Sequence, residues 1–311
     1  MSKPTIGFIG VGYMGHGMAK NLIASGYPLV VKGNRNRTPV EDLVGQGAQE
    51  ATSAREIAEL CDIVHLCLSN SAQVEEVIRG EDGILASGKA GLVVIDTTTA
   101  DPDSTDKLAA ELEAAQMTLV DAPLGRTPKE AEAGTLDTMV GASPEVFDRL
   151  RPVIECWAGN ITHTGDAGSG HRMKLIMNFI SMGYAALYSE ALTMGVKSGL
   201  SPQTIHRVLG SSRMSNGFYD TFMSYAIGRD PEAHKFTIQN GAKDTRYAAS
   251  MARKAEVANL LGAAIANSFQ LAESGGHGGD YVPMLADIVA RQNGIDLKEA
   301  VEAGDDRPAG S

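Results

Sequence analysis

The sequence predicts an α/β fold in which an N-terminal doubly wound sheet is followed by an all-helical C-terminal domain. In the first half, short runs of Val, Ile and Leu alternate with helical segments, as in parallel βαβ units with buried strands. Beyond a glycine-rich stretch at residues 165–170, strand-like alternation is almost absent and helical spacing dominates. At roughly 150 residues per domain, 311 residues agree with two domains, 1–165 and 166–311.

The elements of the first half follow one another at short intervals. A strand at residues 5–9 leads through a glycine-rich turn into a helix at 15–25, and a second strand is expected at 29–32. The remaining elements predicted in this half are a helix at 54–60 and strands at 63–68, 92–95, 118–120 and 136–140.

The second half opens with a long helix at 171–198, which is apolar on most sides and is therefore expected to be buried. Ser201 and Pro202 mark the start of another helix, with Ser at the cap and Pro in the first turn. The other segments predicted here are helical stretches at 239–264 and 281–293, a loop at 274–279 and a frayed tail from Ala303.

Charge and composition exclude several classes of function. The 27 Lys and Arg against 38 Asp and Glu give a net charge of −11, which disfavours binding to nucleic acid or to an anionic membrane. No apolar run approaches the ~20 residues of a membrane span, and the N-terminus leaves no room for a signal peptide. The three cysteines form no CxxC pair, as is typical of reduced thiols. We expect a soluble, cytoplasmic protein.

A glycine-rich turn predicts a dinucleotide site. Gly10-Val11-Gly12-Tyr13-Met14-Gly15 fits GxGxxG and stands between a strand and a helix at the start of a βαβ unit. Gly10 permits a tight turn, Gly12 lets a pyrophosphate approach the backbone, and Gly15 lets helix and strand pack closely. The helix N-terminus offers free N–H groups to the phosphates. These features predict a Rossmann-type, NAD(P)-binding domain, although a purely structural turn would have the same pattern.

The residues after the second strand bear on the choice of cofactor. An NAD site usually has Asp or Glu about 20 residues after the turn, to bind the ribose 2′-hydroxyl. Here the sequence reads Lys32-Gly33-Asn34-Arg35-Asn36-Arg37, with no acid until Glu41. Arginine presents paired donors that suit a 2′-phosphate, so NADP is favoured and NAD remains the alternative. A solvated basic loop would account for the same residues.

Lys174 is the candidate for proton transfer. Asn178 and Ser181 follow it at i+4 and i+7, so the three side chains share one face of the long helix. Burial beside an oxidised nicotinamide would lower the pKa of Lys174, and the ammonium could then protonate an alkoxide as hydride arrives. The alternative is a lysine whose stem packs while its head reaches solvent. The histidines, among them His16, His65 and His163, have no partner at metal-ligand spacing, so no metal site is expected.

Several further motifs occur in register from Ile6 to about Ala248. They are Met18-Ala19-Lys20-Asn21-Leu22 after the turn, Asn34-Arg35, Leu68-Ser69, Asp96-Thr97-Thr98-Thr99, Asp121-Ala122-Pro123, Gly134-Thr135-Leu136, Gly168-x-Gly170-x-x-x-Lys174-x-x-x-Asn178 and Lys243-Asp244. With these motifs the chain resembles the β-hydroxyacid dehydrogenase family, which includes 3-hydroxyisobutyrate dehydrogenase and tartronate semialdehyde reductase.

The resemblance implies roles for individual residues. It implies Lys174 as the general acid/base and Asn178 as a substrate ligand, with Ser181 on the same face. It also implies a second domain like that of 6-phosphogluconate dehydrogenase and a homodimer or homotetramer. Cofactor contacts are implied for the turn residues and for Asn34, Arg35, Leu68, Ser69, Thr99 and Lys243.

The substrate signature departs from the family pattern. Where the family follows Asp-Ala-Pro-Val with Ser-Gly-Gly, this chain has Gly125-Arg126-Thr127 after Leu124. The loss of the hydroxyl together with the gain of a guanidinium suggests a pocket for a stronger or differently shaped oxyanion, with Arg126 and Asn178 orienting the acid group, although a surface cation is the alternative for Arg126. Gly125-Arg126-Thr127 resembles the 3-sulfolactaldehyde reductase branch, as does the stretch 172–190.

Two features set the chain apart from that branch. Met177 stands where the branch has Asn, and the acid that the branch uses for NAD after the second strand is missing. His171, close to the lysine, is expected to cap a helix or to be solvated, and substrate contact is the less favoured alternative.

Together these features predict an NAD(P)-dependent oxidoreductase that interconverts a small 3-hydroxy or ω-hydroxy acid and its semialdehyde. The substrate is expected to be a small anion, with 3-sulfolactaldehyde and succinic semialdehyde as candidates. One alternative is an imine or ketone reductase of the same superfamily, which the lysine disfavours. The other is a nucleotide-binding sensor without catalysis.

Overall fold

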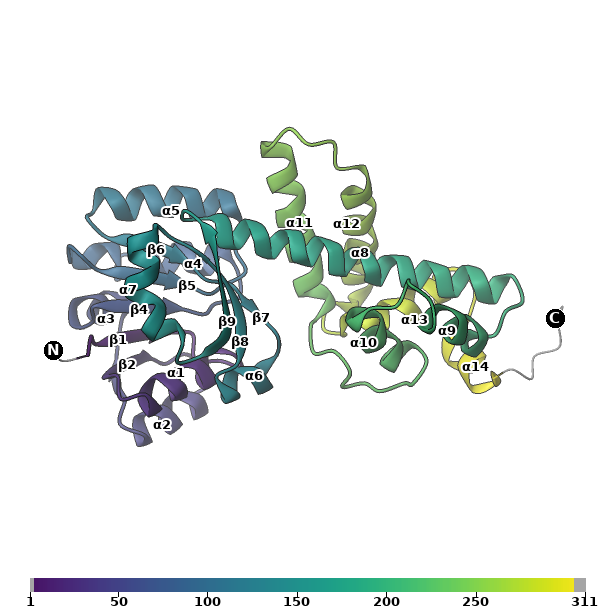
Figure 1. Cartoon of the computed structure of the whole chain (residues 1–311), viewed down its shortest axis with the longest axis horizontal. Coiled ribbons are helices and arrows are strands. Elements are labelled where there is room, and N and C mark those ends of the chain that lie inside the picture. The colour runs from purple at the N-terminus through teal and green to yellow at the C-terminus, as the bar shows by residue number, and fades with distance from the viewer. Residues whose placement is uncertain (1–2, 305–311) are drawn as a thin grey trace. The chain divides into compact units, whose positions relative to one another are not determined.

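The computed structural model describes residues 3–304, and the chain divides into two compact units, Met1–Lys174 and Leu175–Ser311 (Figure 1). The first unit is an α/β sheet domain and the second is helical, which confirms the predicted fold class. The predicted domain boundary after residue 165 stays a prediction. Of the tail expected from Ala303, residues 305–311 lie outside the described part of the chain.

The first unit is built on a nine-stranded sheet with the order β3-β2-β1-β4-β5-β6-β8-β7, in which β9 also pairs with β8. The pairs from β3 to β6 are parallel, whereas β8 runs antiparallel to β6 and β7. Within the described residues the strands are β1 (Ile6–Ile9), β2 (Leu29–Lys32), β3 (Gln49–Ala51), β4 (Ile63–Leu66), β5 (Val93–Asp96), β6 (Thr118–Asp121), β7 (Leu124–Gly125), β8 (Leu136–Gly141) and β9 (Ala158–Gly165).

Alternate residues of the central strands are buried on opposite faces of this sheet. Phe8 and Val31 belong to a core with the helices α1, α2 and α7, while Ile9 and Val94 belong to a second core with α3, α4 and α5. Burial on both faces explains why the strands are continuous apolar runs. The helical segments of this unit are α1 (Gly15–Ala24), α2 (Thr38–Gly45), α3 (Ala54–Leu60), α4 (Ser71–Arg79), η1 (Leu85–Ser87), α5 (Pro102–Ala114), α6 (Pro128–Ala133) and α7 (Pro144–Ile154).

The second unit has a hydrophobic core of its own, which includes Leu192, Tyr219, Phe222 and Phe269. The long helix α8 (Ser169–Lys197) begins in the first unit and contributes most of its length to the second. None of the helices in residues 3–304 combines the length and the apolar character needed to cross a membrane. The remaining helical segments are α9 (Pro202–Gly210), α10 (Gly217–Ala226), α11 (Ile238–Lys254), α12 (Leu260–Ala272), η2 (Glu273–His277), η3 (Val282–Met284), α13 (Leu285–Gln292) and α14 (Leu297–Glu302).

Two segments differ from the sequence prediction. The glycine-rich stretch expected as a loop at 274–279 begins instead as a wide helical turn, η2, that continues α12 and contains Gly276 at φ +89°. The helical stretch expected at 239–264 is two helices, α11 and α12, separated near Glu256, whose φ is +55°. Left-handed backbone at a non-glycine residue ends a helix, and composition alone does not reveal it.

Candidate active site

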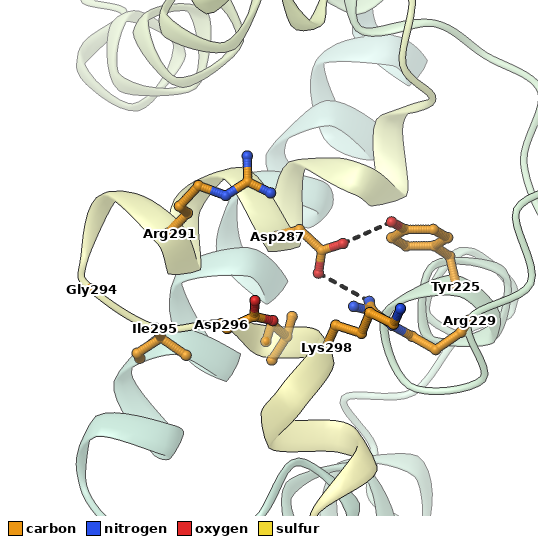
Figure 2. A pocket seen from close by; sticks show the side chains of 9 residues that line it. Tyr225, Arg229, Asp287, Arg291, Gly294, Ile295, Asp296 and Lys298 are labelled. Atoms are coloured by element: carbon orange, nitrogen blue, oxygen red, sulfur yellow. Dashed lines mark hydrogen bonds and ion pairs between the residues drawn. The ribbon is translucent and has the colours of Figure 1, made fainter.

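A cavity of about 520 Å³ lies in the second unit, and none of the predicted site residues lines it (Figure 2). Its charged groups partly neutralise one another, because Asp287 accepts hydrogen bonds from the Tyr225 hydroxyl at 2.7 Å and from Arg229 at 2.9 Å. Burial and the neighbouring Asp287 carboxylate raise the pKa of Tyr225 above its usual range. The predicted site residues lie outside this cavity, in the sheet unit and on α8 and α11.

The glycine turn after β1 has a geometry suited to a phosphate ligand. Gly10 has φ +99°, and a Cβ there would lie 2.2 Å from the carbonyl oxygen of Cys67. A Cβ on Gly15 would lie 2.0 Å from the carbonyl oxygen of Gly10, so both positions are restricted to glycine. A Cβ on Gly12 would meet nothing within 4 Å, which leaves its backbone open to a ligand. No side chain caps α1 and its first turn has no acid, so its N-terminus can receive an anion.

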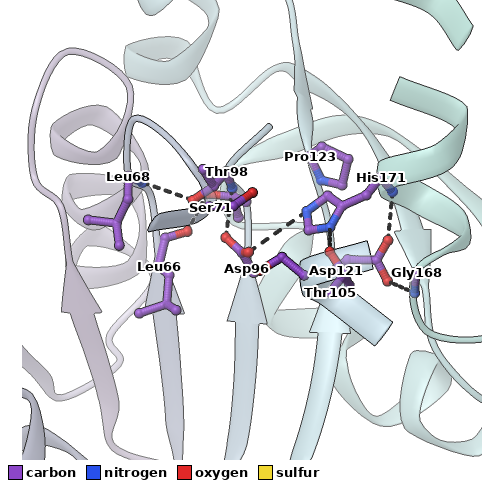
Figure 3. Close-up of polar contacts among 12 residues, drawn as sticks. Leu66, Leu68, Ser71, Asp96, Thr98, Thr105, Asp121, Pro123, Gly168 and His171 are labelled. Carbon is purple, nitrogen blue, oxygen red and sulfur yellow. Dashed lines mark hydrogen bonds and ion pairs between the residues drawn. The ribbon is translucent and has the colours of Figure 1, made fainter. Parts of the chain in front are cut away.

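The loops after β4 and β5 lie beside this turn, because β1, β4 and β5 are parallel neighbours in the sheet. The Leu68 amide donates to the Thr98 hydroxyl at 3.0 Å (Figure 3). The Thr97 hydroxyl donates to the Leu66 carbonyl at 2.7 Å. A Cβ on Gly10 would also lie 3.2 Å from the Leu68 side chain. The structure thus brings together the turn and the predicted Leu68, at the strand ends where sheets of this kind bind ligands.

The basic segment after β2 contains an ion pair that the sequence did not reveal. Arg37 donates to both carboxylate oxygens of Glu50, at 2.7 and 2.8 Å. This bidentate contact raises the pKa of Arg37 and lowers that of Glu50. Glu50 lies in β3 and pairs in register with Val31 of β2, so only the sheet pairing brings it near. Asn34 and Arg35 are exposed, which leaves Arg35 as the guanidinium of this segment available to a ligand.

Three of the predicted substrate residues, Gly125, Arg126 and Thr127, lie between the end of β7 and the start of α6. Arg126 has φ +75°, although it is not glycine, and its Nε donates to Asp137 Oδ2 at 2.9 Å. Asp137 faces Gly125 across the β7–β8 pair, and Gly125 is buried against it. Thr127 caps α6 through a reciprocal contact with Glu130, so its hydroxyl is engaged within the helix end.

Lys174, Asn178 and Ser181 share one face of α8, as predicted from their spacing. Lys174 is half-buried and Asn178 is buried. The Asn178 amide donates to Asp244 Oδ2 at 2.6 Å, and Lys243 Nζ lies 3.3 Å from Asp244 Oδ1. The second unit therefore links two predicted site residues, Asn178 and Lys243, through one buried carboxylate.

His171 differs from its expected role, because its side chain is fully buried and its ring nitrogen Nδ1 lies 2.8 Å from the Thr105 hydroxyl. His65 is also fully buried. Within residues 3–304, no group of three or more His, Cys, Asp or Glu side chains is placed to hold a metal ion.

Comparison with known proteins gives matches along most of the chain. Residues 5–165 match the NAD binding domain of 6-phosphogluconate dehydrogenase, and residues 168–287 match the NAD-binding domain of NADP-dependent 3-hydroxyisobutyrate dehydrogenase. The chain is 32% identical over 292 residues to 2-(hydroxymethyl)glutarate dehydrogenase of Eubacterium barkeri, covering 94% of this chain and 97% of that one.

Two further comparisons agree with these matches. The chain is 31% identical over 273 residues to 3-sulfolactaldehyde reductase of Escherichia coli, covering 88% of this chain and 91% of that one. The solved structure of Mycobacterium tuberculosis 3-hydroxyisobutyrate dehydrogenase with L-serine has the same fold, with a TM-score of 0.83, 24% identity, and coverage of 93% and 99% of the two chains.

Proposed function

The chain belongs to the β-hydroxyacid dehydrogenase family that includes 3-hydroxyisobutyrate dehydrogenase, and from this premise we propose that it interconverts a small 3-hydroxy or ω-hydroxy acid and its semialdehyde, with Lys174 as the general acid/base. Membership of this family establishes that the protein is a hydroxyacid dehydrogenase and that it uses a nicotinamide cofactor. The single observation that carries the finer proposal is the half-buried Lys174, four residues before the buried Asn178 on one face of α8.

In the proposed reaction the glycine turn after β1 and Arg35 would hold the nicotinamide cofactor, which would supply the hydride for the aldehyde carbon. The Lys174 ammonium donates a proton to the carbonyl oxygen as negative charge develops there, and the neutral amine accepts it again in the oxidation direction. Asn178 has one amide hydrogen engaged by Asp244, which fixes the orientation of its side chain toward a ligand.

We propose that Arg126 binds the acid group of the substrate. Its Nε is held by Asp137, so the terminal guanidinium nitrogens remain for a carboxylate or sulfonate in the paired geometry that arginine favours. Gly125 and Thr127 shape the same segment. A sulfonate substrate such as 3-sulfolactaldehyde, or a carboxylate such as succinic semialdehyde, satisfies this donor set. The chain is similar both to the Escherichia coli 3-sulfolactaldehyde reductase and to the Eubacterium barkeri 2-(hydroxymethyl)glutarate dehydrogenase, so both classes of acid belong in the substrate panel.

A panel of substrates tests the function. Purified protein with NADPH or NADH should reduce at least one small anionic aldehyde among 3-sulfolactaldehyde, succinic, methylmalonic and tartronic semialdehydes, followed by absorbance at the nicotinamide band. Lys174→Ala should lower kcat by about 10²- to 10⁴-fold, as expected for losing a general acid. The matched control is Lys197→Ala, at the exposed end of the same helix, which should retain full turnover.

Three outcomes would contradict this proposal. Unchanged turnover in Lys174→Ala removes the lysine from its role. Reduction of cyclic imines but of no aldehyde acid would favour an imine reductase, and cofactor binding without any turnover would favour a nucleotide sensor.

The cofactor preference is proposed to be NADP, through Arg35, with Asn34 beside it. Arg35→Ala should raise the KM for NADPH about tenfold or more, as expected for a lost charged hydrogen bond, and should change the KM for NADH little. Arg37→Ala is the comparison, because Arg37 is engaged by Glu50 and should affect both cofactors alike. A selective loss of NADPH in Arg37→Ala instead would transfer the assignment to that residue.

A further inference from the structure

The first turn of α8 is held by a buried carboxylate from the sheet. Asp121, the last residue of β6, has no exposed surface, and each of its carboxylate oxygens accepts one backbone N–H of the helix start (Figure 3). The Gly168 amide donates to Oδ1 at 2.5 Å and the His171 amide donates to Oδ2 at 2.7 Å. These are N–H groups that a helix start leaves without a partner inside the helix, so Asp121 acts as a helix cap from a distant part of the sequence.

Two glycines leave the space that the Asp121 carboxylate fills. A Cβ on Gly141 would lie 2.3 Å from Oδ1 of Asp121, and a Cβ on Gly170 would lie 2.9 Å from Oδ2. Gly141 also pairs with Asp121 across β6 and β8. The carboxylate therefore lies between the backbone of Gly141 and that of Gly170, and a side chain at either position would collide with it.

The side chain of His171 gives the same turn a second attachment. Its Nδ1 lies 2.8 Å from the Thr105 hydroxyl of α5, and that hydroxyl is 3.2 Å from the Asp101 carbonyl. Its Nε2 points toward Asp96, whose nearer oxygen is 3.9 Å away. Backbone and side chain of one helical turn are thus both tied to the sheet unit.

We propose that Asp121 is a positioning residue for the reaction, which fixes the start of α8 and thereby the place from which Lys174 delivers its proton. Lys174 follows His171 by three residues, or about one helical turn, so a shift of the helix start moves the lysine with it. Displacement of a reacting group by about 1 Å can lower the rate on the order of 10²-fold. This inference rests on the proposed role of Lys174.

The test is a double-mutant cycle between Asp121→Asn and Lys174→Ala. Asparagine keeps the shape of the side chain but replaces one acceptor oxygen with a donor that faces a backbone N–H. We expect Asp121→Asn to lower kcat about 10²-fold, as for a small displacement of the acid, with the KM for aldehyde and the Kd for cofactor within about twofold of wild type. In the Lys174→Ala background the same change should alter kcat by less than about twofold, because its effect passes through the lysine.

A structural readout and a milder variant accompany the cycle. Hydrogen exchange at the amides of residues 168–174 should accelerate in Asp121→Asn, while the remaining helices keep wild-type protection. Thr105→Val removes the hydroxyl partner of His171 with little change in volume, and should give a smaller loss of kcat that is again absent without Lys174. The control is Asp296→Asn, which alters the cap of α14 and should leave kcat unchanged.

The outcomes separate this inference from the proposed function. Wild-type turnover in Lys174→Ala overturns the proposed function and the Asp121 inference together. A large defect in Lys174→Ala combined with wild-type kcat in both Asp121→Asn and Thr105→Val overturns only the role of Asp121. Equal losses of kcat with and without Lys174 also overturn it, since they indicate a general loss of structure.

Discussion

At the scale of single residues, Arg126 combines a functional position with an unfavourable backbone. Its φ of +75° is the left-handed region that glycine adopts freely, and this chain carries arginine where the family pattern has glycine. Such a conformation destabilises a non-glycine residue by roughly 1–2 kcal/mol. Its ion pair with Asp137 is half-exposed, and water screens such pairs so that they add little to stability.

Comparing Arg126→Gly with Arg126→Ala separates these two effects. Both variants lose the guanidinium and should raise the KM for the anionic aldehyde by about one to two orders of magnitude, since a charged hydrogen bond contributes about 1.5–3 kcal/mol. The free energy of unfolding of Arg126→Gly should be roughly 1 kcal/mol higher than that of Arg126→Ala, because only glycine adopts the left-handed φ of this position without strain. Chemical denaturation and steady-state kinetics measure the two quantities. A wild-type KM in either variant would contradict the assignment of Arg126.

His65 in β4 is a second residue with an unusual environment. It is fully buried between Phe8, with which its ring stacks, and Trp157, and neither of its ring nitrogens has a hydrogen-bond partner within the described residues. Burial lowers the pKa of His65 to about 3. The folded protein therefore keeps the ring neutral, while the unfolded chain binds a proton below a pH of about 6.5.

This difference predicts a pH-dependent stability. As the pH falls from about 6.5 toward 3, the unfolded state binds more protons than the folded state. His65 therefore lowers the free energy of unfolding by up to about 1.4 kcal/mol for each pH unit in this range. His65→Leu removes that contribution and the two unpaired nitrogens, so the variant should lose less stability over this range. Urea unfolding at several pH values measures the slopes. Parallel slopes for wild type and variant would exclude His65 as the cause.

At the scale of elements, the sequence predicted the parallel strands β1, β2, β4, β5 and β6 because strands buried on both faces are continuous apolar runs. The short edge strand β3, the two-residue β7 and the largely exposed β9 were not predicted, since they lack such runs. The motifs were located on the elements expected for them, including the turn before α1 and Lys174 on α8.

The partners of the site residues could not be predicted, because sheet register and helix packing create them. Glu50 reaches Arg37 through the β2–β3 pairing, and Asp137 reaches Arg126 through the β7–β8 pairing. The sequence identified Asp121 only as part of the motif Asp121-Ala122-Pro123 and gave it no role. Its contact with the start of α8 spans 47 positions in the sequence, and no local pattern encodes such a distance.

At the scale of the whole molecule, α8 leaves an apolar face exposed, so the burial expected for this helix from the sequence was wrong for that face. Ile176, Ile180 and Leu187 share one face of this helix and are exposed by 43%, 46% and 61%. A row of exposed apolar side chains on one helix is typical of a surface that another protein covers. This face supports the proposal of a homodimer or homotetramer, in which a second copy of the chain would cover it.

Leu187→Glu should therefore dissociate the oligomer, because it would place a carboxylate within a dehydrated interface. Light scattering coupled to size-exclusion chromatography measures the mass. Val208→Glu is the matched control, since Val208 is 60% exposed on another helix, α9, and should keep the wild-type mass. A monomeric wild-type protein, or an unchanged mass for Leu187→Glu, would contradict the prediction.

The Asp121 contact also limits where the chain can be cut. A fragment that ended at residue 165 would lack the amides of Gly168 and His171, so the Asp121 carboxylate would lose both of its backbone donors and the helical turn that covers it. A fragment that ended after Lys174 would retain both. For expression of the nucleotide-binding half alone, the nine residues between 165 and Lys174 therefore decide whether Asp121 keeps its hydrogen-bond donors or is exposed at the cut end of the sheet.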